Sequence, residues 1–240
     1  MRFAIFGDVH ANLHALQAVL QDAAAQSVTH YVCMGDVVGY NAFPHECIEL
    51  VRKLDCPVVK GNHDEQASIT GNQDGFNELA EEAMQWTRSH LTTEDKDWLR
   101  ALRLQRQVRD FTIVHATLDT PHKWGYVFNQ LDAAASFSYQ HTTLCFVGHT
   151  HRPKAYIRDG SVRMADLDVL AIQPGKKYLI NVGSVGQPRD GNPLSAYCIY
   201  DVRSNEVELR RVEYDLAAAQ KAILDAGLPD RLADRLAEGR

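Results

Sequence analysis

The sequence contains no long hydrophobic run. Before Asp8 the N-terminus offers only residues 3–6 as an apolar stretch, which is much shorter than the hydrophobic region of a signal peptide. No later stretch approaches the roughly 20 apolar residues that a membrane-spanning helix needs. We therefore predict a cytoplasmic protein that does not enter a membrane.

An excess of positive charge is also missing. The chain has 25 Lys and Arg residues against 31 Asp and Glu residues, and its net charge is −6. Such a chain does not attract the phosphates of a long nucleic acid or of an anionic membrane through its overall charge. We therefore predict that the protein binds neither a long nucleic acid nor a membrane, although bound divalent cations would reverse the sign of the charge locally.

Cysteines are few and show no C-x-x-C spacing. They are Cys33, Cys47, Cys56, Cys145 and Cys198. An odd number without paired spacing argues against a disulfide framework, and no cysteine follows a Gly-rich or basic turn that would lower the pKa of its thiol. We predict reduced, noncatalytic cysteines that fill small spaces in the core.

Linkers rich in Pro, Gly or Ser, low-complexity segments and repeats of fixed period are absent as well. Nothing therefore marks a domain boundary, and 240 residues that are 45% hydrophobic can bury a substantial core. We predict a single domain over residues 1–240. Within it, residues 65–107 form a helical excursion and residues 215–240 a C-terminal helical tail.

What the sequence does contain is an alternation of strand-like and helix-like segments. Strands are predicted at residues 3–6, 31–34, 57–59, 111–114 and 144–147, and then at 155–158, 162–165, 178–182, 196–200 and 207–212. Helices are predicted at 12–25, 45–54, 131–139 and 216–226, with a short polar segment after the last. The pattern predicts an α/β fold in which two sheets pack face to face and helices lie outside.

Five short polar clusters follow five of these strands. They are Asp8-Val9-His10, Gly35-Asp36, Gly61-Asn62-His63-Asp64, His115 and Gly148-His149-Thr150-His151. Because chemistry in an α/β sheet collects beyond the carboxyl ends of the strands, we expect the clusters to meet in one site. Their carboxylate, amide and imidazole groups suit Mn, Fe or Zn ions better than Ca. The sequence therefore predicts a site for two divalent metal ions.

Most clusters are weak on their own, and only the tetrapeptide Gly61-Asn62-His63-Asp64 is moderately specific. Asp8 and His10 are two residues apart, so their side chains would point to the same side of an extended segment, yet a solvated Asp beside a helix-capping His explains this pair alone better. His115 by itself is typical of an ordinary, partly buried histidine. The prediction of a metal site depends on all five clusters occurring together after strands. Six further histidines match no cluster and are predicted not to be ligands, namely His14, His30, His45, His90, His122 and His141.

In this order and at these intervals, the clusters resemble the motifs of the calcineurin-like metallophosphoesterase superfamily. Three segments, at 35–40, 83–91 and 181–189, resemble its small bacterial phosphodiesterase-like branch. The resemblance implies a four-layer α/β/β/α sandwich of two mixed β-sheets flanked by helices. It also implies the ligands of two metal ions, which are Asp8, His10 and His151 for the first, Asn62, His115 and His149 for the second, and Asp36 bridging both.

One segment departs from relatives in that superfamily. Its protein Ser/Thr phosphatases and symmetric dinucleoside tetraphosphatases carry Gly-Asp-x-x-Asp-Arg-Gly, whereas Gly39 and Tyr40 stand here in place of the second Asp and the Arg. The departure argues against those two specificities. It also leaves two candidates for orienting His63, which are Asp64 and a backbone carbonyl.

The resemblance implies a metal-dependent phosphoric ester hydrolase in which a metal-bridging hydroxide attacks the phosphorus. His63 is the candidate for protonating the leaving oxygen or for donating a hydrogen bond to the phosphoryl oxygens. We predict small-molecule or nucleotide phosphodiesters as substrates and manganese among the metals. A phosphomonoesterase or nucleotidase, and a noncatalytic protein-binding scaffold with the same fold, stay open as alternatives, and the oligomeric state is not predicted.

Substrate-binding residues are less clearly marked. Arg189 lies in a Gly/Pro-rich loop, where its guanidinium could bind a substrate phosphate, and an ion pair with Asp190 is an equal alternative. Three aromatic residues, Tyr40, Trp124 and Tyr126, could stack on a base or an aryl group. For these we favour packing between loops.

Overall fold

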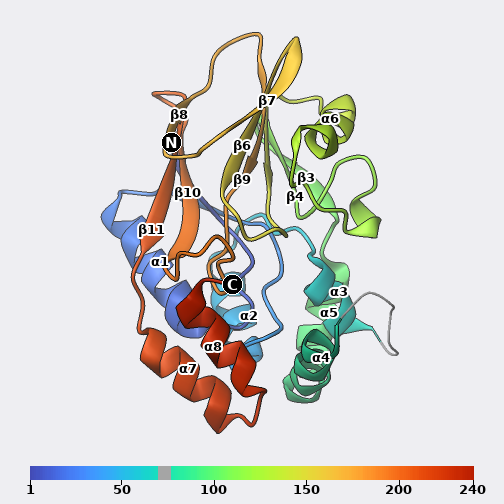
Figure 1. Ribbon diagram of the computed structural model, residues 1–240, viewed down its shortest axis with the longest axis vertical. Coiled ribbons are helices and arrows are strands. Elements are labelled where there is room, and N and C mark those ends of the chain that lie inside the picture. Colours follow the sequence, from blue (N-terminus) through green and yellow to red (C-terminus); the bar gives the residue numbers. More distant parts are fainter. Residues whose placement is uncertain (70–76) are drawn as a thin grey trace.

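The computed structural model describes residues 1–69 and 77–240, and two β-sheets form its centre (Figure 1). In spatial order, the first sheet consists of β2 (His30–Cys33), β1 (Arg2–Phe6), β10 (Ser195–Asp201), β11 (Glu206–Val212) and β8 (Val169–Ala171). The second consists of β3 (Gln105–Val108), β4 (Phe111–Val114), β5 (Leu144–Val147), β9 (Lys177–Asn181), β6 (Lys154–Asp159) and β7 (Ser161–Ala165).

Both sheets contain parallel and antiparallel pairs. In the first sheet β1 pairs with β2 in parallel and with β10 antiparallel. In the second sheet β4, β5 and β9 are parallel, and β6 joins β9 antiparallel. The prediction of two mixed sheets flanked by helices is confirmed.

Strand β1 shows why the sheets stack. Its side chains alternate between two buried layers, because successive residues of a strand point to opposite faces. Phe3 and Ile5 join the core between the sheets, together with Phe111 and Phe146 of the second sheet. Ala4 and Phe6 join the core on the outer face of the first sheet. A strand buried on both faces reads as an unbroken apolar run, as this one does.

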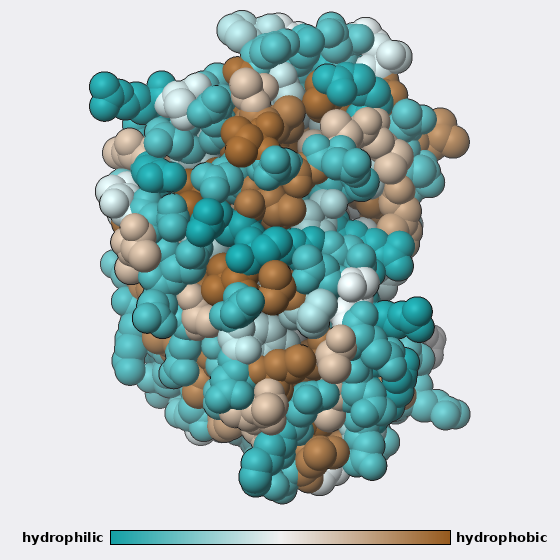
Figure 2. Space-filling view, turned by 60° about the vertical axis from the view of Figure 1, so that its left-hand side comes forward, coloured by the Kyte–Doolittle hydropathy of each residue, from teal (hydrophilic) through white to brown (hydrophobic). Residues whose placement is uncertain are grey.

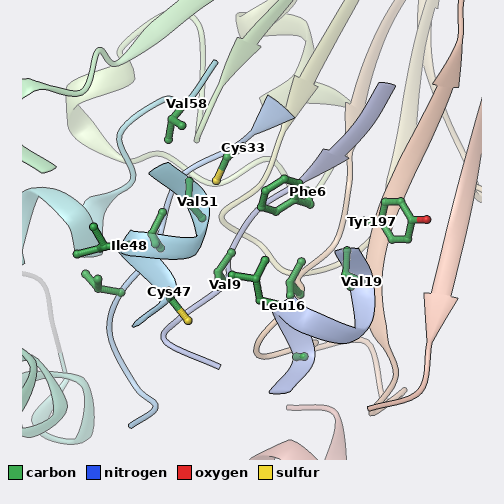
Figure 3. Close-up of a cluster of buried hydrophobic side chains, with 14 of the residues drawn as sticks. Phe6, Val9, Leu16, Val19, Cys33, Cys47, Ile48, Val51, Val58 and Tyr197 are labelled. Atoms are coloured by element: carbon green, nitrogen blue, oxygen red, sulfur yellow. The ribbon is translucent and has the colours of Figure 1, made fainter. Parts of the chain in front are cut away.

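Helices α1 (Leu13–Ala25) and α2 (Pro44–Lys53) cover the outer face of the first sheet. Leu16 and Val19 of α1 pack there near Phe6, and Ile48 of α2 belongs to the same cluster (Figure 3). Asn12 begins α1, since its side chain accepts a hydrogen bond from the backbone N–H of Ala15. Helix α6 (Gln130–Tyr139) covers the second sheet by packing Ala133 and Phe137 against it. The four layers that the resemblance implied are therefore present.

The remaining helices lie at one end of the sheets (Figure 1). They are α3 (Asn62–Ser68), α4 (Glu78–His90), α5 (Thr93–Ala101), α7 (Leu216–Asp225) and α8 (Asp230–Glu238). A 3₁₀ turn covers Pro121–Lys123. Helices α3, α4 and α5 occupy most of the described part of the helical excursion predicted at 65–107, of which residues 70–76 lie outside the described residues. Helices α7 and α8 pack against each other, and buried Tyr40 joins their apolar cluster.

Several sequence predictions were wrong in detail. The strand predicted at 57–59 is reduced to two isolated bridges, from Val58 to Cys33 and from Val59 to Arg103. The helical tail predicted at 215–240 was expected to end in a short polar segment after residue 226, but that segment contains a second helix, α8, whose Leu232 and Leu236 are buried. Strands β3 and β8 were not predicted. Both are short strands at sheet edges, where few neighbours impose an alternating pattern.

Figure 2 shows one face of the molecule, on which hydrophobic residues lie between hydrophilic ones. Among the described residues, no helix combines the length and the apolar character needed to cross a lipid bilayer. All five cysteine thiols are free, and all except that of Cys56 are in buried residues.

Candidate metal centre

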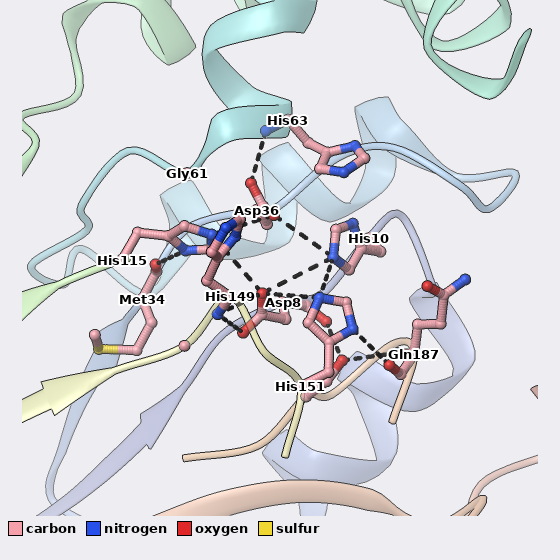
Figure 4. Close-up of polar contacts among 12 residues, drawn as sticks. Asp8, His10, Met34, Asp36, Gly61, His63, His115, His149, His151 and Gln187 are labelled. Atoms are coloured by element: carbon pink, nitrogen blue, oxygen red, sulfur yellow. Dashed lines mark hydrogen bonds and ion pairs between the residues drawn. The ribbon is translucent and has the colours of Figure 1, made fainter. Parts of the chain in front are cut away.

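The segments that follow four strands, together with the start of α3, bring the predicted site residues together (Figure 4). Asp8 and His10 follow β1, Asp36 follows β2, His115 follows β4, and His149 and His151 follow β5. Asn62 and His63 are the first residues of α3. All eight side chains belong to buried residues. The structure thus gathers every residue that the sequence analysis named for metal binding and proton transfer.

The sequence predicted an extended backbone around Asp8 and His10, and the structure shows a different one. Asp8, His10, Asp36, His149 and His151 all have positive φ angles, between 49° and 68°. Left-handed backbone is unfavourable for residues other than glycine and persists only where the surrounding structure imposes it. The extended geometry predicted for Asp8 and His10 was therefore wrong, although their side chains do meet.

Two buried imidazoles face each other at the centre of the site. The Nε2 atoms of His10 and His151 are 3.0 Å apart. The Nδ1 atom of His10 lies 3.2 Å from the carbonyl oxygen of Val38, and that of His151 lies 2.6 Å from the carbonyl oxygen of Gln187. Because a carbonyl oxygen only accepts, each Nδ1 carries the proton and each Nε2 presents a lone pair. Two facing lone pairs repel unless a cation lies between them.

Carboxylates complete this first group. Asp8 Oδ1 is 3.1 Å from Nε2 of His151, and Asp36 Oδ2 is 3.6 Å from Nε2 of His10. Burial lowers the pKa of both His10 and His151 well below the ordinary value, which keeps the rings neutral. One atom from each of these four residues lies within 4.8 Å of the others. This donor set, with two carboxylates and two neutral imidazoles, fits a divalent transition metal ion.

A second group shares Asp36 with the first. One atom from each of Asp36, His115 and His149 lies within 4.8 Å of the others. His115 donates from Nδ1 to the carbonyl oxygen of Met34 at 2.8 Å, and its Nε2 faces Asp36 Oδ2 at 3.3 Å. Within the described ranges, neither this Nε2 nor the buried Oδ1 of Asn62 has a hydrogen-bond partner. The Oδ1 atom of Asn62 is therefore free to bind a cation, and Nε2 of His115 can bind one when it carries no proton.

The negative charges of Asp8 and Asp36 also favour the binding of a cation in the site. Burial alone lowers the pKa of His115, but the negative charges of Asp36 and Asp8 outweigh it and raise that pKa to about 10. Burial and, to a smaller extent, the neighbouring His115 together lower the pKa of His149 to about 3. In the metal-free protein a proton on His115 therefore lies beside the two carboxylates, and a metal ion bound to Nε2 would replace it.

Position 61 must be a glycine because the side chain of Asp36 lies very close to its backbone. A Cβ atom at position 61 would lie 2.0 Å from Oδ1 of Asp36, which no side chain can tolerate. The same oxygen accepts a hydrogen bond of 2.8 Å from the backbone N–H of His63. The first turn of α3 therefore closes directly onto the carboxylate shared by the two groups.

Asp64 holds the turn that carries Asp36. Its oxygens accept hydrogen bonds from the backbone N–H groups of Asp36, Val37 and Gly61, at 2.8, 2.8 and 3.0 Å. Both oxygens are thus committed to the backbone. Asp64 positions Asp36, and its suggested role in orienting His63 finds no support in these contacts.

The ring of His63 lies among other rings. Its centre is 4.5 Å from that of Tyr40 and 4.7 Å from that of His10. A Cβ atom at Gly39, where φ is +96°, would lie 2.4 Å from Nδ1 of His63. Burial lowers the pKa of His63 to about 4, with Asp36 opposing and Arg189 adding to the effect. The Gly39-Tyr40 pair that departs from the superfamily pattern therefore forms one wall of the His63 environment.

A family model described as the calcineurin-like phosphoesterase superfamily domain matches residues 1–205. The chain belongs to this superfamily. A metallophosphoesterase from Sphaerobacter thermophilus has a similar structure, with a TM-score of 0.91 and 41% identity over 100% of this chain and 99% of that one.

Two further relatives extend the comparison. An uncharacterized protein from Methanocaldococcus jannaschii is 37% identical over 242 residues, which cover 99% of this chain and 98% of the relative. A hypothetical protein from Pyrococcus horikoshii OT3 has a TM-score of 0.83 at 18% identity and covers 100% of this chain and 98% of that one. At such low identity the second comparison shows only that the fold is shared.

In this calcineurin-like phosphoesterase, a cavity of about 280 Å³ opens beside the two groups. Asp36, Asn62, His63, His149 and His151 line it. All three aromatic residues noted in the sequence line it as well, and Tyr126 stacks on the ring of His149, with centres 4.1 Å apart. Their interpretation as mere loop packing was therefore incomplete.

Arg189 also lines the cavity. The alternative of an ion pair with Asp190 is wrong, because Asp190 pairs with Arg211. Arg189 instead donates from Nη2 to Oε1 of Gln187 at 2.9 Å and contacts the hydroxyl of Tyr40 at 3.4 Å. Its guanidinium stays on the cavity wall.

Sequence reasoning missed Arg235, Lys123 and Gln66, which also line the cavity. No motif marks them. Arg235 lies on α8, which the apolar spacing of Leu228, Leu232 and Leu236 could have revealed as an amphipathic helix. The six histidines predicted not to be ligands belong to neither clustered group within the described chain.

Proposed function

We propose that the protein is a phosphoesterase that depends on two divalent metal ions and hydrolyses small phosphodiesters. The observation that carries this proposal is the pair of buried ligand groups that share Asp36. Membership of the superfamily supports phosphoric ester hydrolysis. Mn, Fe and Zn are the metals that this mixture of carboxylate, amide and imidazole donors suits best.

The ligand assignment follows the two groups. Asp8, His10 and His151 would hold one ion, and His115, His149 and Asn62 the other, with Asp36 touching both. The free atoms of His115 and Asn62 and the facing nitrogens of His10 and His151 support it. When bound, such a metal pair lowers the pKa of a nearby water and neutralises charge that develops on the phosphoryl oxygens.

His63 is the residue that we propose for proton transfer. It lines the cavity beside Asp36, and the hydrogen bond from its backbone N–H to Asp36 fixes its position relative to the proposed ions. From this place its ring could protonate the leaving oxygen or donate a hydrogen bond to a phosphoryl oxygen, and such help is typically worth roughly 10²- to 10⁴-fold in rate.

The size of the cavity supports a small substrate. A volume of about 280 Å³ is close to the lower end, roughly 300 Å³, of pockets that hold small molecules. We further propose that residues 1–240 act as one domain, because α8 supplies Arg235 to the cavity wall. The free thiols of all five cysteines support a cytoplasmic location as part of this proposal.

The test is a substrate panel on protein reconstituted separately with Mn²⁺, Fe²⁺ and Zn²⁺. We expect about two ions per chain by elemental analysis and faster hydrolysis of bis-p-nitrophenyl phosphate than of p-nitrophenyl phosphate. A preference for the monoester would favour the phosphomonoesterase alternative. Metal binding without hydrolysis of either ester, or of cyclic nucleotides and dinucleotides, would favour the noncatalytic scaffold.

A further inference from the structure

Two arginines from distant parts of the chain meet at one wall of the cavity. Arg235 comes from α8 and Arg189 from the loop after β9, and both line the cavity. Their guanidinium carbons lie 5.9 and 5.6 Å from the centre of the Tyr40 ring. That ring lies 4.5 Å from the ring of His63. The Tyr40 ring thus lies beside both guanidinium groups and beside the ring of the proposed catalytic residue.

The protein holds both side chains in place. The end of α8 is tied to the Arg189 loop, because the backbone N–H of Gly191 donates to the carbonyl oxygen of Gly239 at 3.0 Å. Arg235 donates from Nε to the carbonyl oxygen of Arg240 at 2.9 Å. Arg189 is held by Gln187, and its buried Nε has no hydrogen-bond partner within the described residues.

Neither guanidinium is neutralised by an acidic side chain in the part of the chain that the structure describes. Arginines immediately nearby are neutralised, since Arg231 on the same helix pairs with Glu238, and Arg211 pairs with Asp190. Burial lowers the pKa of Arg235, and the charge of Arg189 adds to the effect. Two neighbouring cations that repel each other destabilise the free protein, and a bound anion would remove that cost.

We propose that Arg235 and Arg189 bind a second anionic group of the substrate, a phosphate or a carboxylate, while the scissile phosphate lies against the Asp36 groups. This inference rests on the proposed phosphoesterase function and narrows its substrate class to esters with two anionic groups. Guanidinium groups suit such a subsite, because their planar N–H donors match phosphate and carboxylate oxygens.

A pair of nitrophenyl esters tests the subsite. Thymidine 5′-(p-nitrophenyl phosphate) carries one anionic group, and its 3′-phosphorylated form carries a second at the opposite end. In the wild type we expect a higher kcat/KM for the 3′-phosphorylated ester. In Arg235→Gln this preference should fall about 10- to 100-fold, through KM more than kcat, because a charged hydrogen-bonding partner is lost.

The matched control is Arg231→Gln, which removes a charge from the exposed face of the same helix and should leave the preference unchanged. Arg235→Lys keeps the charge, so it should retain part of the preference and guards against a merely structural effect of the Gln variant. A third ester with a 3′-O-carboxymethyl group shows whether the subsite takes a carboxylate as well as a phosphate.

Binding of thymidine 3′,5′-bisphosphate, measured by calorimetry on metal-loaded protein, gives a readout that needs no turnover. Weaker binding in Arg235→Gln, by about the same 10- to 100-fold, supports the subsite even if no ester is hydrolysed and the proposed function fails. Equal bisphosphate affinity and equal ester preference in the wild type and Arg235→Gln would overturn the subsite, even in an active phosphodiesterase.

Discussion

Replacing Asp64 by Asn tests whether the carboxylate of Asp64 stabilises the turn that carries Asp36. The carboxylate of Asp64 accepts three backbone N–H groups, from Asp36, Val37 and Gly61. Asn keeps the shape of the side chain but exchanges one acceptor oxygen for an NH₂ donor. If its oxygen keeps the contacts with Asp36 and Gly61, the new NH₂ group faces the N–H of Val37, and two donors oppose each other.

The cost follows from that geometry. A buried donor left without an acceptor costs about 1–3 kcal/mol. Burial and the charge of Asp36 raise the pKa of Asp64 to about 7, so removing the charge of Asp64 also relieves repulsion and offsets part of the loss. We expect a net decrease of about 1–2 kcal/mol in the free energy of unfolding. Because the Asp36 turn loosens, metal affinity should fall about 10- to 100-fold.

Urea denaturation of the metal-free protein and calorimetric titration with Mn²⁺ measure these two effects separately. Asp215→Asn is the matched control, since Asp215 caps α7 by accepting from the backbone N–H of Ala218 and Asn caps helices as well as Asp does. It should change the free energy of unfolding by less than about 0.5 kcal/mol. An Asp64→Asn protein with wild-type unfolding and wild-type metal affinity would refute the reasoning.

Three further substitutions address the catalytic residue, its surroundings and the pH dependence of stability. His63→Ala should keep both ions by elemental analysis yet lower kcat roughly 10²- to 10⁴-fold, and an unchanged kcat would remove His63 from the mechanism. Gly39→Ala should lower kcat while metal binding is retained, because the new Cβ would collide with the His63 ring; normal turnover would show that this contact does not matter. Asp95→Asn should destabilise the protein at pH 7 by about 1 kcal/mol. Burial raises the pKa of Asp95, but hydrogen bonds from Thr92 and His45 outweigh it and lower that pKa below 3.8. The ionised carboxylate therefore stabilises the fold above pH 3.8, and this contribution is lost as pH falls through the lowered pKa. The difference in Tm between the wild type and Asp95→Asn should therefore shrink on acidification. A constant difference in Tm would contradict this account.

The sequence predicted the parts of the fold that local patterns encode. Residues 111–114 and 144–147 were predicted as strands, and they form β4 and β5 with those bounds. Each has apolar residues on both faces, as a strand between two buried layers requires. The prediction failed at 57–59, where the chain makes isolated bridges to two partners and no regular ladder.

The site was predictable because its residues occur in short motifs after strands. Their contacts were not, because these contacts depend on backbone geometry and on distant segments. The positive φ angles of Asp8 and His10 cannot be read from a D-x-H spacing. Arg235 reaches the cavity only because α8 packs beside Tyr40, a contact between residues far apart in the chain.

The most direct test of the central claim is anomalous diffraction from crystals soaked in Mn²⁺. We predict two anomalous peaks about 3.5–4 Å apart, with the carboxylate of Asp36 bound to both. One peak should contact Asp8, His10 and His151, and the other His115, His149 and Asn62. A single peak, or peaks away from Asp36, would contradict the assignment.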